Sequence, residues 1–168
     1  MINTDNKSTR YCIDTDSWIN LPRNYPIKVF DGLWNNIELL INEGRIYSPR
    51  EVFRELEKKD DEIHKWIKVR KSILIKNPDN DCLQIAYEII NKFNLVDPLS
   101  NKSYADPYVI SLAVQQKRIL NEVNVCVVSQ ETRAGGGAKQ VKIPNVCDHY
   151  KIECLKLVDL FQRENWKF

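Results

Sequence analysis

Four acidic residues stand where the sequence pattern places the ends of strands or the beginnings of helices. Asp14 directly follows a short apolar run, Glu131 lies just past a second run, and Glu55 and Asp106 fall on predicted helices. In a parallel α/β sheet, the carboxyl ends of the strands meet at one edge. Carboxylates gathered there would repel one another unless hard cations neutralised them, and Mg²⁺ and Mn²⁺ prefer such oxygen ligands. The pattern therefore predicts a divalent-cation site that activates water and stabilises phosphoryl oxygens.

Each of these residues also has a plainer structural role. An Asp at a helix start commonly caps free backbone N–H groups, which is the alternative for Asp14 and Asp106. Asp16 is a fifth candidate ligand, and its alternative role is to cap a short helix predicted at 17–20. A carboxylate that closes a buried strand is costly to bury alone, which favours a functional role for Asp14.

The elements that must position these side chains follow from the apolar spacing. Short apolar runs predict strands at 11–13, 45–47, 72–76, 123–129 and 151–155. Helical spacing predicts helices at 30–41, from 49 onward with a break near 58–62, and at 83–93, 106–117 and 156–166. This alternation predicts an α/β fold: one domain with a central parallel sheet, helices on both faces and Asp14 closing the most central strand.

Two local predictions concern helix geometry. Ser48 is expected to be an N-cap, with Pro49 at the first helical position and Glu51 closing a capping box. In the helix at 83–93, an apolar stripe is expected to face inward, formed by Leu83, Ala86, Ile89, Ile90 and Phe93.

Composition limits the class of protein. The chain has 168 residues, which suits one domain, and 25 Lys and Arg against 23 Asp and Glu give a net charge of only +2. That balance argues against binding nucleic acid by bulk charge alone. The polar segment 1–10 is expected to be a flexible extension of a domain at 11–168, with neither a secretory signal nor a membrane span. Five cysteines without a C-x-x-C pair predict a cytoplasmic protein with reduced thiols.

A glycine-rich stretch at 132–140 is expected to be a mobile surface loop. Arg133, Lys139 and Lys142 flank its three consecutive glycines. These side chains are candidate RNA-binding residues, because phosphate contacts position a nucleic acid without reading its sequence. The alternative is a solvated loop without a partner.

Four stretches together resemble the PIN-domain nuclease family. They are Tyr11-Cys-Ile-Asp14-Thr-Asp-Ser-Trp-Ile19, Ser48-Pro-Arg-Glu-Val-Phe-Arg-Glu55-Leu56, Ala105-Asp106-Pro-Tyr-Val-Ile-Ser-Leu-Ala113 and Val127-Val-Ser-Gln-Glu131. Each stretch is weak alone, but all four occur in the family's order. The closest likeness is to PIN-like proteins of bacteria and archaea that are related to VapC-type toxins.

The resemblance implies a Mg²⁺- or Mn²⁺-dependent endoribonuclease that hydrolyses RNA phosphodiester bonds. It implies that Asp14, Glu55, Asp106 and Glu131 are catalytic metal ligands, and it allows Asp16 as an additional ligand. Position 16 is Asp where Asn or Ser is common, and position 131 is Glu where Asp is usual. The segment between the second and third stretches is also longer than in compact toxins.

The likeness to toxins implies partners as well. It implies a role as the toxin of a toxin–antitoxin pair, with a protein antitoxin. Some of the large apolar residues around the first stretch are expected to form a homodimer or partner surface: Trp18, Leu21, Phe30 and Trp34.

Two other functions remain open at this point. Asp14-Thr-Asp16 after a strand also resembles the nucleophile motif of haloacid-dehalogenase-type phosphatases, although the expected residue two places beyond the second Asp is replaced by Trp18. A catalytically inactive PIN-like module that binds RNA or protein is the third possibility. Metal-dependent RNA cleavage would separate the nuclease from the inactive module, and turnover of a phosphomonoester would identify the phosphatase.

Overall fold

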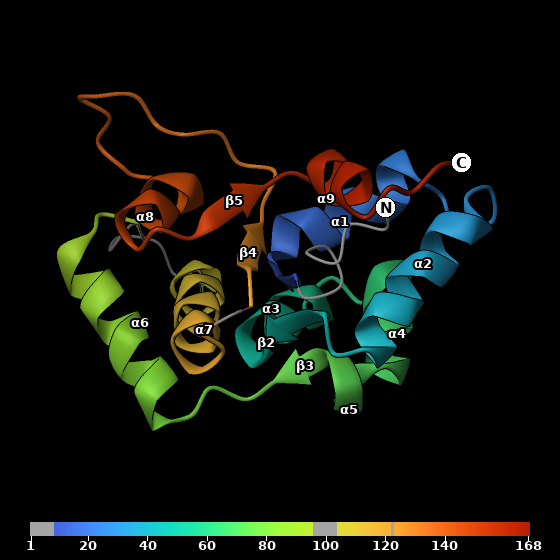
Figure 1. Cartoon of the computed structure of the whole chain (residues 1–168), viewed down its shortest axis with the longest axis horizontal. Helices are drawn as coiled ribbons and strands as arrows, with labels where there is room; N and C mark the ends of the chain where they lie inside the picture. Colours follow the sequence, from blue (N-terminus) through green and yellow to red (C-terminus); the bar gives the residue numbers. More distant parts are fainter. Residues whose placement is uncertain (1–8, 96–103, 122) are drawn as a thin grey trace.

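A five-stranded, fully parallel sheet forms the centre of the protein, in the order β3-β2-β1-β4-β5 (Figure 1). The computed structural model describes residues 9–95, 104–121 and 123–168. The strands are β1 (Arg10–Ile13), β2 (Ile46–Pro49), β3 (Ile75–Lys76), β4 (Val125–Val128) and β5 (Glu153–Leu155). The described helices are α1 (Thr15–Asn24), α2 (Asp31–Asn42), α3 (Arg50–Glu57), α4 (Glu62–Val69), α5 (Lys71–Leu74), α6 (Asn80–Lys92), α7 (Asp106–Ile119), α8 (Ile143–His149) and α9 (Leu157–Arg163).

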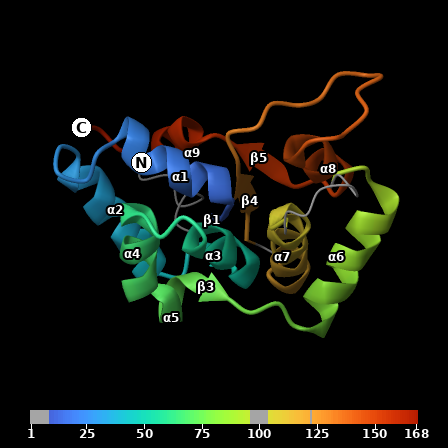
Figure 2. The same cartoon turned by 180° about the vertical axis from the view of Figure 1, so that it is seen from behind.

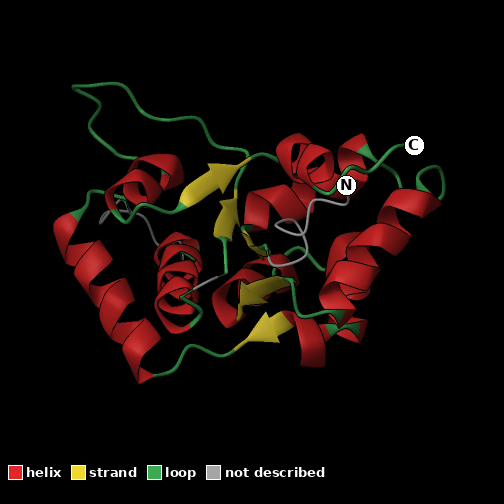
Figure 3. Ribbon diagram, viewed as in Figure 1, coloured by secondary structure: helices red, strands yellow, loops and turns green. Residues whose placement is uncertain are grey.

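Helices cover both faces of this sheet. The helices α6, α7 and α8 lie on one side, while α2, α4 and α9 lie on the other (Figures 1 and 2). Adjacent side chains of β1 contact opposite helical layers. The Cys12 thiol donates to the Val109 carbonyl of α7 at 3.5 Å, whereas the Tyr11 hydroxyl donates to Glu164, beyond α9, at 2.5 Å. The strands form a narrow band between the two helical layers (Figure 3). The predicted α/β fold with a central parallel sheet is therefore confirmed.

The central position of β1 aligns the strand ends that matter for the site. β1 pairs in parallel with both β2 and β4, so the three strands end at the same edge. The Ser48 hydroxyl donates to the Ile13 carbonyl at 2.6 Å and accepts the indole N–H of Trp18 at 2.9 Å. These bonds fix the last residue of β1, immediately before Asp14.

The same serine explains why one predicted helix start is wrong. Ser48 belongs to β2, and Pro49 is the N-cap of α3. The Ser48 hydroxyl is committed to β1 and Trp18, so it does not cap the helix. Glu51 consequently closes no capping box, and its carboxylate contacts Arg50 at 3.3 Å.

Two further predictions shift in detail. The segment predicted as a strand at 72–76 begins as the short helix α5, and only Ile75–Lys76 pairs with β2. In α6 the buried face is rotated: Leu83 and Ile90 are 41% and 44% exposed. The residues that pack inward are Cys82, Ile85, Ala86 and Ile89.

The aromatic residues near the first stretch are part of the core. Trp18, Leu21 and Trp34 are buried within the chain, and Phe30 packs edge-on against Tyr25. The expectation that some of these four residues form a homodimer or partner surface stays a prediction; Trp18, Leu21 and Trp34 belong to the core, and Phe30 is partly exposed. Trp66 of α4, which sequence reasoning did not pair with them, packs against two of these residues, with its ring tilted to that of Trp18 and edge-on to that of Trp34.

The remaining sequence predictions concern the N-terminal segment and the glycine-rich loop. Of the N-terminal segment 1–10, residues 1–8 lie outside the described part, while Thr9 is buried and Arg10 begins β1. The loop between β4 and α8 is long and extended, and its glycines are exposed (Figure 1). It is joined to the end of α6 where the Gln140 amide donates to the Leu95 carbonyl at 2.8 Å. Within the described residues, no helix has the length and apolar character that a membrane crossing requires.

Candidate active site

All five predicted carboxylates line one cavity of about 450 Å³ at the carboxyl edge of the sheet. We call it the carboxylate cavity; it is lined by Asp14, Thr15, Asp16, Ile19, Glu55, Lys58, Lys59, Tyr104, Asp106 and Glu131. The acidic residues come from four separate parts of the chain, so only the fold brings them together.

Asp14 combines a structural role with a place in the cavity. Its side chain is 2% exposed, and one oxygen accepts the backbone N–H of Ser17 at 2.7 Å as the N-cap of α1. Burial raises the pKa of Asp14 to about 7, against the opposing effect of hydrogen bonds from Ser17 and Ser129. The helix starts at Thr15, so Asp14 is the cap, and Asp16 lies in the first turn instead of capping a helix at 17–20.

Glu55 is held by two hydrogen bonds from different elements. One carboxylate oxygen accepts the Thr15 hydroxyl at 2.6 Å, and the other accepts the backbone N–H of Ala105 at 2.7 Å. The side chain thus joins α1, α3 and the segment that leads into α7. These contacts fix the orientation of Glu55 in the cavity.

Asp106 is the carboxylate whose ionisation is opposed most strongly by its surroundings. Burial raises its pKa to about 8, with further contributions from the charges of Glu131, Asp14, Glu55 and Asp16. Crowded carboxylates disfavour one another's ionisation, so Asp106 is largely protonated at neutral pH when no cation is present. A bound cation would reverse this effect.

Glu131 approaches from the segment after β4. One of its carboxylate oxygens accepts the backbone N–H of Ile143, at the start of α8, at 2.9 Å. Glu131 thus contacts α8 and lines the cavity at once.

The donor set fits a hard divalent cation in kind, because it consists of carboxylate oxygens. As they stand in the described residues, no three His, Cys, Asp or Glu side chains form a ready-made metal site. Hydrogen bonds within the chain already engage three of the carboxylates: Ser17 donates to Asp14, Thr15 and Ala105 donate to Glu55, and Ile143 donates to Glu131. Asp14, Asp16, Glu55, Asp106 and Glu131 are the residues that would hold the ion.

The predicted RNA-binding residues lie outside this cavity. None of Arg133, Lys139 and Lys142 is among its lining residues. The guanidinium of Arg133 donates two hydrogen bonds of 2.7 Å to Asp148, so its charge is compensated locally. A contact between this loop and RNA stays a prediction.

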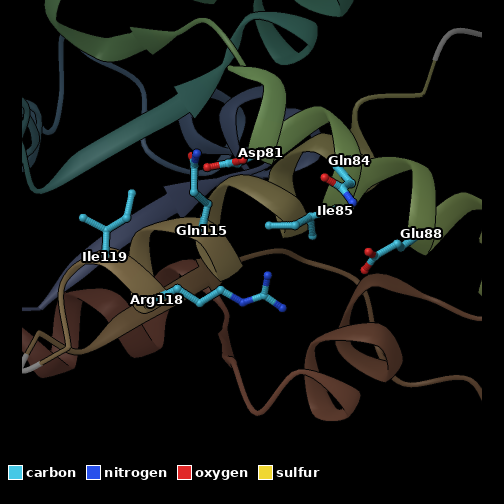
Figure 4. Close-up of a pocket in the computed structure, with 7 residues that line it drawn as sticks. All are labelled: Asp81, Gln84, Ile85, Glu88, Gln115, Arg118 and Ile119. Carbon is cyan, nitrogen blue, oxygen red and sulfur yellow. The ribbon is translucent and has the colours of Figure 1, made fainter.

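A second cavity of about 250 Å³ lies between α6 and α7 (Figure 4). Residues of both helices face it, and they carry mixed charge: Asp81, Gln84, Ile85, Glu88, Gln115, Arg118 and Ile119. None of the predicted catalytic carboxylates lines this cavity.

Sequence reasoning missed four polar residues of the carboxylate cavity: Thr15, Lys58, Lys59 and Tyr104. A signal was present for Lys58, because it follows Glu55 by three residues and caps the same helix, whereas Lys59 lies in the turn beyond the helix end. Thr15 adjoins Asp14, and Tyr104 precedes Asp106 by two residues.

No curated protein matches the chain closely enough to be named as a relative. Residues 11–168 match a family model described as a domain of unknown function, DUF4411. That match covers all five strands except the first residue of β1, and it includes every residue of the carboxylate cavity. The chain therefore belongs to the DUF4411 family.

Proposed function

We propose that this protein is a Mg²⁺- or Mn²⁺-dependent endoribonuclease whose active site is the carboxylate cavity. The observation that carries the proposal is the convergence of Asp14, Glu55, Asp106 and Glu131, from four separate parts of the chain, on one cavity at the strand ends. Raised pKa values at Asp14 and Asp106 support it, because such values cluster at functional sites. The resemblance to PIN-domain nucleases supports the reaction class.

Asp14, Glu55 and Asp106 would hold one or two ions, with Glu131 contributing directly or through water and Asp16 as a further ligand. When bound, a divalent cation lowers the pKa of water and stabilises the charge that grows on phosphate oxygens. The chain's own contribution is to hold the carboxylates in place: Thr15 and Ala105 orient Glu55, and Ser17 orients Asp14.

No histidine base is required by this arrangement. His64 is buried against Asp60, with 3.1 Å between its ring nitrogen and the carboxylate, and His149 lies 3.0 Å from the Lys92 amine. Neither histidine lines the carboxylate cavity.

Asp14 and Asp106 must lose their protons to bind a cation, so cleavage is expected to accelerate as pH rises through 7 to 8.

The proposal extends to partners and location. The resemblance to VapC-type toxins leads us to propose a protein antitoxin and a homodimer as partners, with RNA as substrate. Each of the five cysteines is free, in keeping with the cytoplasmic location that we propose.

To test this function, the wild-type protein is incubated with total RNA in Mn²⁺ or in EDTA, and in parallel with a generic phosphomonoester. We expect RNA fragments only in Mn²⁺ and no turnover of the phosphomonoester. Release of phosphate from the monoester would instead identify a phosphatase. RNA that is bound but stays intact in Mn²⁺ would identify an inactive binding module.

A further inference from the structure

Two lysines and a tyrosine line the carboxylate cavity but have no part in holding a cation. Lys58 and Lys59 lie where α3 ends, and Tyr104 lies just before α7. All other charged residues that line the cavity are acidic. The two ammonium groups are therefore the feature of this cavity that attracts an anion.

The turn that carries the lysines is fixed by the backbone. The N–H groups of Lys59 and Asp60 both donate to the Leu56 carbonyl, at 3.1 and 3.3 Å, and Asp60 has a positive φ of 43°. Asp61 then caps α4 by accepting the N–H of His64 at 3.2 Å. The lysines thus project from a turn that is closed on both sides by hydrogen bonds.

Their spacing directs them toward Glu55. Residues three and four positions apart on a helix are neighbours on its surface. Lys58, the C-cap of α3, lies at the first of these spacings from Glu55, and Lys59 follows it in the turn; both line the cavity with the carboxylates. A phosphate held by these amines would therefore lie next to the carboxylates.

Tyr104 supplies a different kind of contact. It is partly exposed and lines the same cavity as the lysines. Aromatic rings bind unpaired bases by stacking, and basic side chains follow the phosphates of a single strand. A cavity of about 450 Å³ lies within the range for small-ligand sites, so it has room for an unpaired nucleotide.

We propose that Lys58, Lys59 and Tyr104 are the strand-binding residues of this cavity: the lysines hold a backbone phosphate of a single-stranded nucleic acid, and Tyr104 stacks on an adjacent base. This inference rests on the proposed function, because it assigns the substrate contacts of the same site. It places the main phosphate contacts at the α3–α4 turn, whereas the sequence pattern suggested the glycine-rich loop.

The test measures binding of a fluorescent single-stranded RNA oligonucleotide to the full chain in EDTA, so that binding is separated from cleavage. Lys58→Ala combined with Lys59→Ala is expected to weaken binding at least tenfold. Loss of this phosphate contact should also reduce the slope of log affinity against log salt by about 0.7. Tyr104→Leu is expected to weaken binding roughly 5- to 100-fold, while Tyr104→Phe retains stacking and stays near the wild type.

A matched control removes the same charge elsewhere. Lys65→Ala combined with Lys68→Ala changes two exposed lysines of α4 that do not line the cavity, and this variant is expected to bind within about twofold of the wild type. Lys139→Ala combined with Lys142→Ala tests the competing RNA contact at the glycine-rich loop, and it is expected to lose less affinity than the Lys58 and Lys59 double variant. Circular dichroism and melting temperature verify that every variant is folded.

The outcomes separate this inference from the proposed function. Undiminished binding by the Lys58 and Lys59 double variant, or a larger loss in the loop variant, would overturn the inference even if the wild type cleaves RNA. Equal affinity of the wild type for a duplex of the same sequence would also overturn it. If these residues bind the strand as expected but Mn²⁺ yields no cleavage, the proposed function fails and the binding assignment stands.

Discussion

Replacing Asp14 or Asp106 with Asn is expected to slow RNA cleavage by about 1,000-fold or more. Both carboxylates are proposed cation ligands, and loss of the charge that supports a transition state costs orders of magnitude in rate. The rate is measured in a single turnover with excess protein, so that changes in RNA affinity do not enter. Below saturation with Mn²⁺, the loss should be larger, because weaker cation binding is added to it.

The substitutions are chosen to preserve the fold. Asn is as good an N-cap as Asp, so Asp14→Asn retains the contact with Ser17 that begins α1. Asp81→Asn is the matched control, because Asp81 lines the second cavity between α6 and α7 (Figure 4). It should cleave at the wild-type rate. Wild-type cleavage by both Asp14→Asn and Asp106→Asn would show that the catalytic site lies elsewhere.

Without divalent cations, Asp106→Asn is expected to make the protein more stable at pH 8, by on the order of 2 kcal/mol. The pKa of Asp106 is raised to about 8 in the folded protein, mainly by burial and then by neighbouring carboxylates. A raised carboxyl pKa means that the folded state binds the proton more tightly than the unfolded state. The stability of the wild type therefore falls as pH rises from about 4 toward 8. Asn bears no charge at any pH, so the variant escapes this loss.

Urea denaturation in EDTA at pH 5 and pH 8 checks the sign of the stability difference between Asp106→Asn and the wild type. The advantage of Asp106→Asn should be clear at pH 8 and much smaller at pH 5, where Asp106 is protonated. Asp81→Asn should show no comparable pH-dependent gain. A variant that is less stable than the wild type at pH 8 would mean that burial and the neighbouring carboxylates do not raise the pKa of Asp106 in solution.

The strand-end carboxylates were predictable because each has a local signal. Asp14 directly follows a buried apolar run, Glu131 lies just past another, and Asp106 precedes a long apolar helix. Parallel pairing of β1 with β4 then forces the two strand ends together. The order of the elements and the physical chemistry of sheets were sufficient for this part.

Residues whose roles depend on distant partners were not predictable in the same way. Ser48 has the sequence environment of a helix cap, yet its hydroxyl binds the Ile13 carbonyl and Trp18. The face of α6 was misplaced because apolar residues occur on two adjacent sides, and only packing against α7 selects Ile85 and Ile89 over Leu83.

The charges around the glycine-rich loop show the same limit. Arg133 and Asp148 are 15 positions apart, and their ion pair depends on how the loop folds against α8. Lys59 and Tyr104 are distant in the sequence but line one cavity, in which Glu55 binds both the Thr15 hydroxyl and the Ala105 N–H. Sequence spacing alone carries no information about such contacts across the fold.

The central claim is that the carboxylate cavity holds a divalent cation, and titration of Mn²⁺ during thermal unfolding tests it most directly. Binding to the folded state alone stabilises a protein by mass action, so saturating Mn²⁺ should raise the melting temperature of the wild type by about 5–10 °C. Asp14→Asn combined with Asp106→Asn should remove most of that rise, whereas Asp81→Asn should retain it. An equal rise in the double variant and the wild type would show that the cation binds elsewhere and would contradict the assignment of this site.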